Sequence, residues 1–197
     1  MIATRNAHKT REVQRILGTE FTVRDLGPYP EISEIRESGT SFEENATLKA
    51  LTVSRKLSGF IVADDSGLEV DAIGGAPGIY SARYAGMNAS EEEKIDKLLR
   101  ELARVGATDD ARRGRFRCVM ALARNGSLLG TFEGTAEGKI ADKPRGNRGF
   151  GYDPIFVPEG FEQTFSELPA EVKNTISHRA RAICALAVKL QQLEPND

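Results

Sequence analysis

The sequence predicts an α/β protein in which helices pack on an extended mixed sheet. Helical stretches with apolar residues on one face alternate with short apolar runs along the 197 residues. An Asn125-Gly126 turn joins two long alternating stretches, residues 116–122 and 128–138, and so predicts a hairpin with antiparallel strands. The length suits one core or two closely packed lobes, and we expect a single domain over residues 1–197.

The first elements predict an anion site near the N-terminus. A very short strand is expected at residues 2–4, followed by a helix whose C-terminal end is marked by Gly18. The turn between them, residues 4–9 (TRNAHK), places backbone N–H groups at a helix start, where anions are favoured, and Arg5 and Lys9 add mobile charge. The same stretch is also typical of a solvated first helical turn.

The next elements surround an acidic pair. A short strand is expected at residues 21–23. A helix opens with the capping box at Ser41 and runs to about Leu57. A buried strand at residues 60–63 should then stop at Asp64 and Asp65, which are costly to desolvate unless a cation or hydrogen-bond donors meet them. With the glycines that follow, this pair indicates Mg²⁺ and a phosphate-bearing substrate. The alternative is a turn capped by local side-chain hydrogen bonds.

The second half of the chain alternates helices, the hairpin and a glycine-rich loop. Another capping box, at Ser90, opens a third helix. After the hairpin we expect a loop at 139–153, a short strand at 155–157, a short helix at 166–173 around Pro169, and a last helix starting near residues 177–179.

Composition excludes several classes of protein. The formal net charge of −2 gives no general surface for polyanions, so we expect no nucleic-acid partner. No apolar run approaches the ~20 residues of a membrane span. The N-terminus lacks a signal-peptide pattern. Cys118 and Cys184 lie in apolar surroundings without metal-type spacing, which indicates reduced thiols in a cytoplasmic protein.

Four stretches together resemble one known family. They are residues 4–9 (TRNAHK), 63–67 (ADDSG) with the glycine-rich extension, 150–154 (FGYDP) and 173–179 (KNTISHR), with SFEENATLKA between the first two. In this order and spacing they closely resemble the inosine triphosphate pyrophosphatases, also called XTP/dITP diphosphatases or Ham1-like proteins. The resemblance spans nearly the whole chain.

The resemblance implies an elongated two-lobed α/β fold with the active cleft between the lobes, a homodimer, and Mg²⁺. Members hydrolyse ITP, dITP and XTP to the monophosphate and pyrophosphate, which removes these nucleotides from the pool. Asp65 would be the catalytic base and a metal ligand. The second ligand would be Glu37, with Glu31 as a competitor. The substrate would be bound by residues of all four stretches: Thr4, Arg5, Asn6, Ala7, His8, Lys9, Ser66, Phe150, Gly151, Tyr152, Asp153, Lys173, His178 and Arg179.

The residue chemistry agrees with these roles, although other interpretations stay open. A cationic donor such as Lys173 or Arg179 pairs with the C6 carbonyl of hypoxanthine or xanthine and is left unpaired against the amino group of adenine. Taken singly, Phe150 and Tyr152 are also typical of core aromatics, His178 of a helix start, and Asp153 of a turn. Competing functions are a Maf-like pyrophosphatase for modified nucleotides, a non-catalytic nucleotide-binding protein and an Asp-nucleophile phosphatase.

Overall fold

The computed structural model describes residues 1–33 and 35–193 and has the α/β architecture that the sequence predicts. The chain divides into two compact units. Unit 1 comprises Met1–Asp65, Cys118–Gly134 and His178–Asp197, and unit 2 comprises Ser66–Arg117 and Thr135–Ser177. No helix within the described residues is long and apolar enough to span a membrane.

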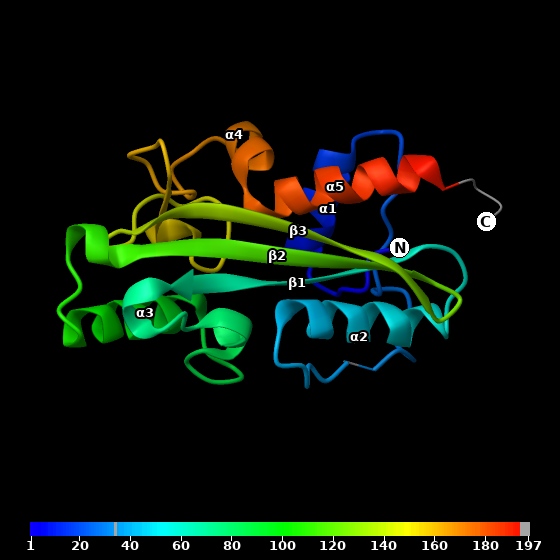
Figure 1. Cartoon of the computed structure of the whole chain (residues 1–197), viewed down its shortest axis with the longest axis horizontal. Coiled ribbons are helices and arrows are strands. Elements are labelled where there is room, and N and C mark those ends of the chain that lie inside the picture. The colour runs from blue at the N-terminus through cyan, green and yellow to red at the C-terminus, as the bar shows by residue number, and fades with distance from the viewer. Residues whose placement is uncertain (34, 194–197) are drawn as a thin grey trace. The chain divides into compact units, whose positions relative to one another are not determined.

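A four-stranded sheet in the order β1-β2-β3-β4 provides the framework (Figure 1). The strands are β1 (Ile61–Val70), β2 (Arg113–Arg124), β3 (Ser127–Ile140) and β4 (Phe156–Pro158). The predicted hairpin joins β2 to β3 at Asn125 and Gly126, which have φ angles of 51° and 78°, the positive values that a tight hairpin turn requires. A parallel bridge from Ile2 to Val62 makes the pairing mixed.

In unit 1, helices cover both faces of the strands. Figure 1 shows α2 (Phe42–Ser54) on one side and α1 (Ala7–Leu17) with α5 (His178–Gln192) on the other. Successive strand residues point to opposite faces. Ile61 accordingly packs in a cluster with Val53 of α2, whereas Val62 packs in a second cluster with apolar residues of α1 and α5.

Unit 2 has its own apolar core. Its helices are α3 (Glu91–Arg104) and α4 (Ala170–Ile176), and α3 starts at the predicted capping box of Ser90. The rings of Phe116 and Phe156 lie 4.7 Å apart, and those of Phe156 and Phe165 lie 5.1 Å apart, in a cluster that includes buried leucines of α3. Short 3₁₀ helices connect these elements, at Asp71–Ile73, Gly78–Arg83, Asp109–Arg112 and Asp153–Ile155.

The prediction that the strand stops at the acidic pair is wrong. Strand β1 starts at Ile61, continues through Asp64 and Asp65, and ends at Val70. The reason is that cationic side chains meet both carboxylates within the unit, so the strand can carry charges in its buried part.

Three further elements differ from the prediction, each for a local reason. Residues 21–23 form no strand, because the side chain of Gln14 takes up their backbone groups: it donates to Phe21 O and accepts from Val23 N. Helix α2 ends at Ser54, three residues before the predicted end. The predicted short helix at 166–173 is shifted and starts after Pro169, a residue that cannot continue a helix toward the N-terminus.

Candidate active site

The two neighbouring carboxylates of β1 lie in different surroundings. As successive residues of a strand, Asp64 and Asp65 point to opposite faces. Asp64 therefore meets Lys9 of α1 and Arg179 of α5, while Asp65 meets α2. Both are buried. The pleat of β1 thus separates two acidic groups that are adjacent in the sequence.

Asp65 shares a cation with Glu37. The ammonium of Lys49 lies 3.2 Å from Asp65 Oδ1 and 2.7 Å from Glu37 Oε1. Asn45, one turn earlier on α2, donates to Asp65 Oδ2 over 3.1 Å. The two carboxylates that the sequence predicted as metal ligands therefore converge on one positive group. Glu31, the competitor of Glu37, is exposed and does not line the cavity at this site.

The charges of this group are mutually dependent. Burial raises the pKa of Asp65; Lys49 opposes this effect, and the nearby carboxylate of Glu37 adds to it. Burial alone would lower the pKa of Lys49, but Asp65, Asp64 and Glu37 outweigh it and raise that pKa. A cation is thus required where Glu37 and Asp65 meet, because a buried carboxylate and a half-buried one repel each other when nothing separates them.

Asp64 is the centre of a second ionic group. Its two carboxylate oxygens lie 3.0 and 2.8 Å from Lys9 Nζ, and Oδ2 lies 3.5 Å from Arg179 Nη2. Arg179 also donates to Glu12. Burial alone would raise the pKa of Asp64, but Lys9, Arg179 and Lys49 outweigh it and hold the pKa well below its usual range. Asp64 is therefore ionised at neutral pH.

The predicted anion-binding turn is partly satisfied by its own side chains. The side chain of Asn6 caps α1 and accepts from His8 N and Lys9 N over 2.9 and 3.3 Å. Arg5 is not a mobile charge, because its guanidinium donates to the carbonyls of Leu26, Tyr29 and Ile32 over 2.8, 2.9 and 2.6 Å. The ammonium of Lys9, which Asp64 holds, is the cationic group of this turn that is not bound by backbone carbonyls in the contacts described.

A cavity of about 440 Å³ unites these groups within unit 1. Basic, acidic and a few apolar side chains line it. Its lining consists of Ala3, Thr4, Arg5, Lys9, Leu26, Ser33, Ile35, Glu37, Lys49 and Asp64. The lysines, the carboxylates and the start of α1 suit a highly charged phosphate chain with an accompanying cation.

Unit 2 brings three other predicted residues together. Lys173 Nζ donates to Asp153 Oδ2 over 2.6 Å and lies 5.1 Å from the centre of the Phe150 ring. Asp153 also accepts from Phe150 N over 2.9 Å. Gly149 makes this possible, because a Cβ there would lie only 2.0 Å from Asp153 Oδ2. The FGYDP turn and Lys173 thus form one polar and aromatic group.

The remaining predicted site residues have no part in the polar contacts described above. Tyr152 is buried in the core of unit 2, and its hydroxyl donates to Ser81 O over 3.0 Å, so Phe150 is the more accessible ring. Ser66 follows Asp65 on β1, and Gly151 has a φ of 64° in the FGYDP turn. His178 is buried at the start of α5 in unit 1.

Three polar residues were missed by the sequence reasoning: Asn45, Lys49 and Glu12. Asn45 and Lys49 are four residues apart in α2 and so lie on the same face of the helix, which was a usable signal. Glu12 carried no such signal, because α1 contains many charged residues.

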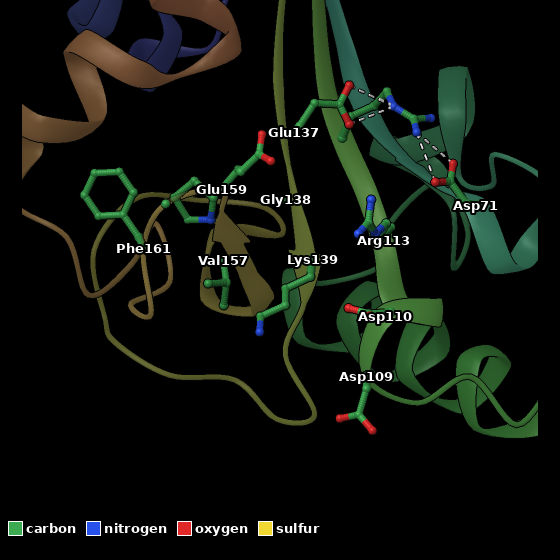
Figure 2. Close-up of a pocket in the computed structure, with 13 residues that line it drawn as sticks. Asp71, Asp109, Asp110, Arg113, Glu137, Gly138, Lys139, Val157, Glu159 and Phe161 are labelled. Carbon is green, nitrogen blue, oxygen red and sulfur yellow. Dashed lines mark hydrogen bonds and ion pairs between the residues drawn. The ribbon is translucent and has the colours of Figure 1, made fainter.

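A second cavity, of about 380 Å³, lies in unit 2 and contains none of the predicted residues (Figure 2). Arg115 is bound there by the carboxylates of Asp71 and Glu137, over 2.9 and 3.1 Å. Three charged side chains of this cavity, Arg115, Asp71 and Glu137, thus neutralise one another. Within the described residues no group of three or more His, Cys, Asp or Glu side chains is arranged to hold a metal. Mg²⁺ usually takes only one or two carboxylates and keeps several waters, so the Glu37–Asp65 pair still fits it.

The chain is similar to known proteins over nearly its whole length. The family model described as "Ham1 family" matches residues 1–189. The dITP/XTP pyrophosphatase of Shouchella clausii is 46% identical over 195 residues, which cover 99% of this chain and 98% of that protein. The corresponding protein of Geobacter sulfurreducens is 48% identical over 188 residues, covering 94% and 93%.

Solved structures agree. A HAM1 protein from Coxiella burnetii has a TM-score of 0.87 at 38% identity, covering 98% of both chains. The Ham1 protein of Staphylococcus aureus has a TM-score of 0.85 at 40% identity, covering 97% of both. Together with the family match, these similarities show that the chain is a member of the Ham1 family.

Proposed function

We propose that this protein hydrolyses non-standard purine nucleoside triphosphates (ITP, dITP and XTP) to the monophosphate and pyrophosphate and so removes them from the nucleotide pool. The observation that carries the proposal is the convergence of Glu37 and Asp65 on one cation beside Lys9 and the start of α1. Relatives with 46–48% identity that bear the name dITP/XTP pyrophosphatase support the choice of substrate.

The triphosphate would be bound at the turn before α1. Thr4, Asn6, Ala7 and His8 shape this turn, and the ammonium of Lys9 would neutralise the departing pyrophosphate. Glu37 and Asp65 would hold Mg²⁺, which supplies charge neutralisation across the phosphates when bound. Their convergence on Lys49 shows that these carboxylates already face a common positive charge.

Asp65 would serve as the general base. Its buried carboxylate has a raised pKa, which makes it a better proton acceptor than an ordinary aspartate once it is ionised. Asn45 donates to Oδ2 and Lys49 to Oδ1, which fixes the carboxylate, and its further lone pairs would orient a water molecule for in-line attack on the α-phosphate. Ser66, the next residue of the strand, would contact the substrate.

The base would be read by the group around Lys173. The ammonium of Lys173, which Asp153 holds beside the ring of Phe150, would donate to the C6 carbonyl of hypoxanthine or xanthine. The ring of Phe150 offers a face for stacking, and Gly151 and Tyr152 hold the turn. We also propose His178 and Arg179, at the start of α5 in unit 1, as substrate-binding residues.

We further propose that the whole chain, residues 1–197, acts as one catalytic domain and forms a homodimer in the cytoplasm without nucleic-acid partners. Cys118 and Cys184 are both free thiols, which supports a reducing compartment. Size-exclusion chromatography with light scattering tests the dimer.

The decisive experiment measures pyrophosphate release from ITP, XTP, dITP, GTP, ATP and dUTP with Mg²⁺. We expect rapid release from the first three and far slower release from ATP and GTP. Orthophosphate as the primary product would contradict the proposal, because it requires attack at the terminal phosphate. A preference for dUTP or another pyrimidine would favour a Maf-like activity instead.

A further inference from the structure

We propose that Glu12 is a positioning residue, which sets the ammonium of Lys9 through Arg179 and Asp64. This inference rests on the proposed function, in which Lys9 binds the triphosphate. Glu12 does not line the 440 Å³ cavity, so its effect on the substrate must pass through other side chains.

Four side chains of alternating charge form a continuous row. Glu12 accepts from Arg179 Nη1, Arg179 Nη2 lies 3.5 Å from Asp64 Oδ2, and the same Asp64 oxygen lies 2.8 Å from Lys9 Nζ. Glu12 and Lys9 are three residues apart on α1, so they lie on the same face of that helix. The row therefore begins and ends on α1 and passes through α5 and β1.

Burial makes the row interdependent. The side chains of Arg179 and Asp64 are each only 2% exposed, whereas that of Lys9 is 20% exposed and lines the cavity. A buried charge is costly unless opposite charges surround it. Arg179 thus needs the carboxylate of Glu12 on one side as well as that of Asp64 on the other.

Removal of the Glu12 charge should redistribute the remaining contacts. Asp64 Oδ2 is the atom that Arg179 and Lys9 share. Without Glu12, the guanidinium is drawn toward this oxygen, and the hold of Asp64 on Lys9 weakens. Lys9 keeps its charge but loses its fixed place. The Glu37–Asp65 pair should be unaffected, because its contacts are on the other face of β1, with α2.

The first test compares Glu12→Gln with Glu20→Gln. Glu20 is an exposed carboxylate of the same unit that accepts a long hydrogen bond of 3.4 Å from Gln191, and it serves as the matched control. Isothermal titration with inorganic tripolyphosphate should show binding about tenfold weaker for Glu12→Gln, the loss expected for one charged hydrogen bond. Binding of Mn²⁺ should not change. Equal tripolyphosphate affinity in both variants, or loss of Mn²⁺ binding in Glu12→Gln, would overturn the proposal.

The second test is a double-mutant cycle with Lys9→Ala. If Glu12 acts through Lys9, Glu12→Gln should lower kcat/KM about tenfold in the wild-type background and less than about twofold in Lys9→Ala. If the two substitutions instead lower kcat/KM independently, so that their factors multiply in the double variant, Glu12 has a merely structural role. Glu12→Asp, which keeps the charge, should restore part of the activity and covers the case in which Glu12→Gln does not fold. The tripolyphosphate titration needs no turnover, so it still tests the row if the wild type fails to release pyrophosphate from ITP.

Discussion

The ammonium of Lys173 donates to the carboxylate of Asp153 over 2.6 Å, and both side chains are almost fully buried. A buried cation of this kind is stable because its counter-charge is built into the FGYDP turn. The pairing holds the ammonium of Lys173 beside the ring of Phe150. A planar base with a carbonyl is the kind of ligand that suits such a group.

Lys173→Ala should therefore reduce the preference for ITP over ATP. The substitution removes the donor that favours a C6 carbonyl, and the penalty against adenine disappears with it. A charged hydrogen bond is worth roughly 1.5–3 kcal/mol, so the ratio of the kcat/KM values for ITP and ATP should fall about 10- to 150-fold. We expect KM to rise more than kcat falls. Lys143→Ala, at an exposed lysine of the same unit, is the control. Equal losses for both substrates would instead make Lys173 a structural or phosphate-binding lysine.

Asp65→Asn should abolish most of the activity and leave the fold intact. Asparagine keeps the shape of the side chain but removes the anion that holds the metal and accepts the proton. General-base catalysis contributes 10²–10⁴-fold, so kcat should fall by at least about 100-fold. Pyrophosphate release at saturating ITP measures the loss, and circular dichroism checks the fold. Near-normal turnover would refute the role and direct attention to Asp64.

Lys49→Met should make the protein dependent on a divalent cation for stability. In the metal-free protein this change leaves Glu37 and Asp65 facing each other without a counter-charge, and removal of one partner of a buried ion pair costs about 3 kcal/mol. Added Mg²⁺ should restore part of this loss, because a ligand that binds only the folded state raises its stability. Thermal unfolding in EDTA and in Mg²⁺ is the measurement, with Lys56→Met at an exposed position as the control. Equal gains from Mg²⁺ in wild type and Lys49→Met would contradict the shared-cation arrangement.

The two cysteines should differ in reactivity. Burial raises the pKa of the Cys118 thiol to about 12, so this group stays protonated and covered at neutral and mildly basic pH, whereas Cys184 is exposed. A disulfide reagent should modify one thiol per native chain between pH 7 and 9, and both thiols in denaturant. Native Cys184→Ser should not react. Rapid labelling of that variant would show that the β2 region opens readily.

The sequence was sufficient to predict the class of fold, the hairpin and the helix starts, because these depend on local signals such as Asn125-Gly126 and the capping boxes at Ser41 and Ser90. It was not sufficient for elements whose ends depend on tertiary contacts. Strand β1 continues past Asp65 because Lys9 and Lys49, which are distant in the chain, meet its carboxylates.

The candidate site, like the fold, was predictable from the sequence only in part. The residue types of the four motifs identify which side chains belong to it, but their partners depend on three-dimensional placement. Arg5 looks like a phosphate-binding residue in the sequence, yet its guanidinium is occupied by three carbonyls. Lys49 has no motif of its own, yet it joins Glu37 to Asp65. Spacing along the chain contains no information of this kind.

The alternation of Asp64 and Asp65 across β1 makes the site more sensitive to insertions and deletions than to many substitutions. Each side chain reaches its partners because its odd or even position in the strand decides which face of the sheet it points to. Residue type alone does not decide this. Insertion or deletion of one residue in β1 before the pair would exchange the two faces, so that Asp64 would turn toward α2 and Asp65 toward α1. Homologues can therefore vary the apolar residues around this pair, whereas the number of residues between the start of β1 and the pair must be kept even or compensated elsewhere in the strand.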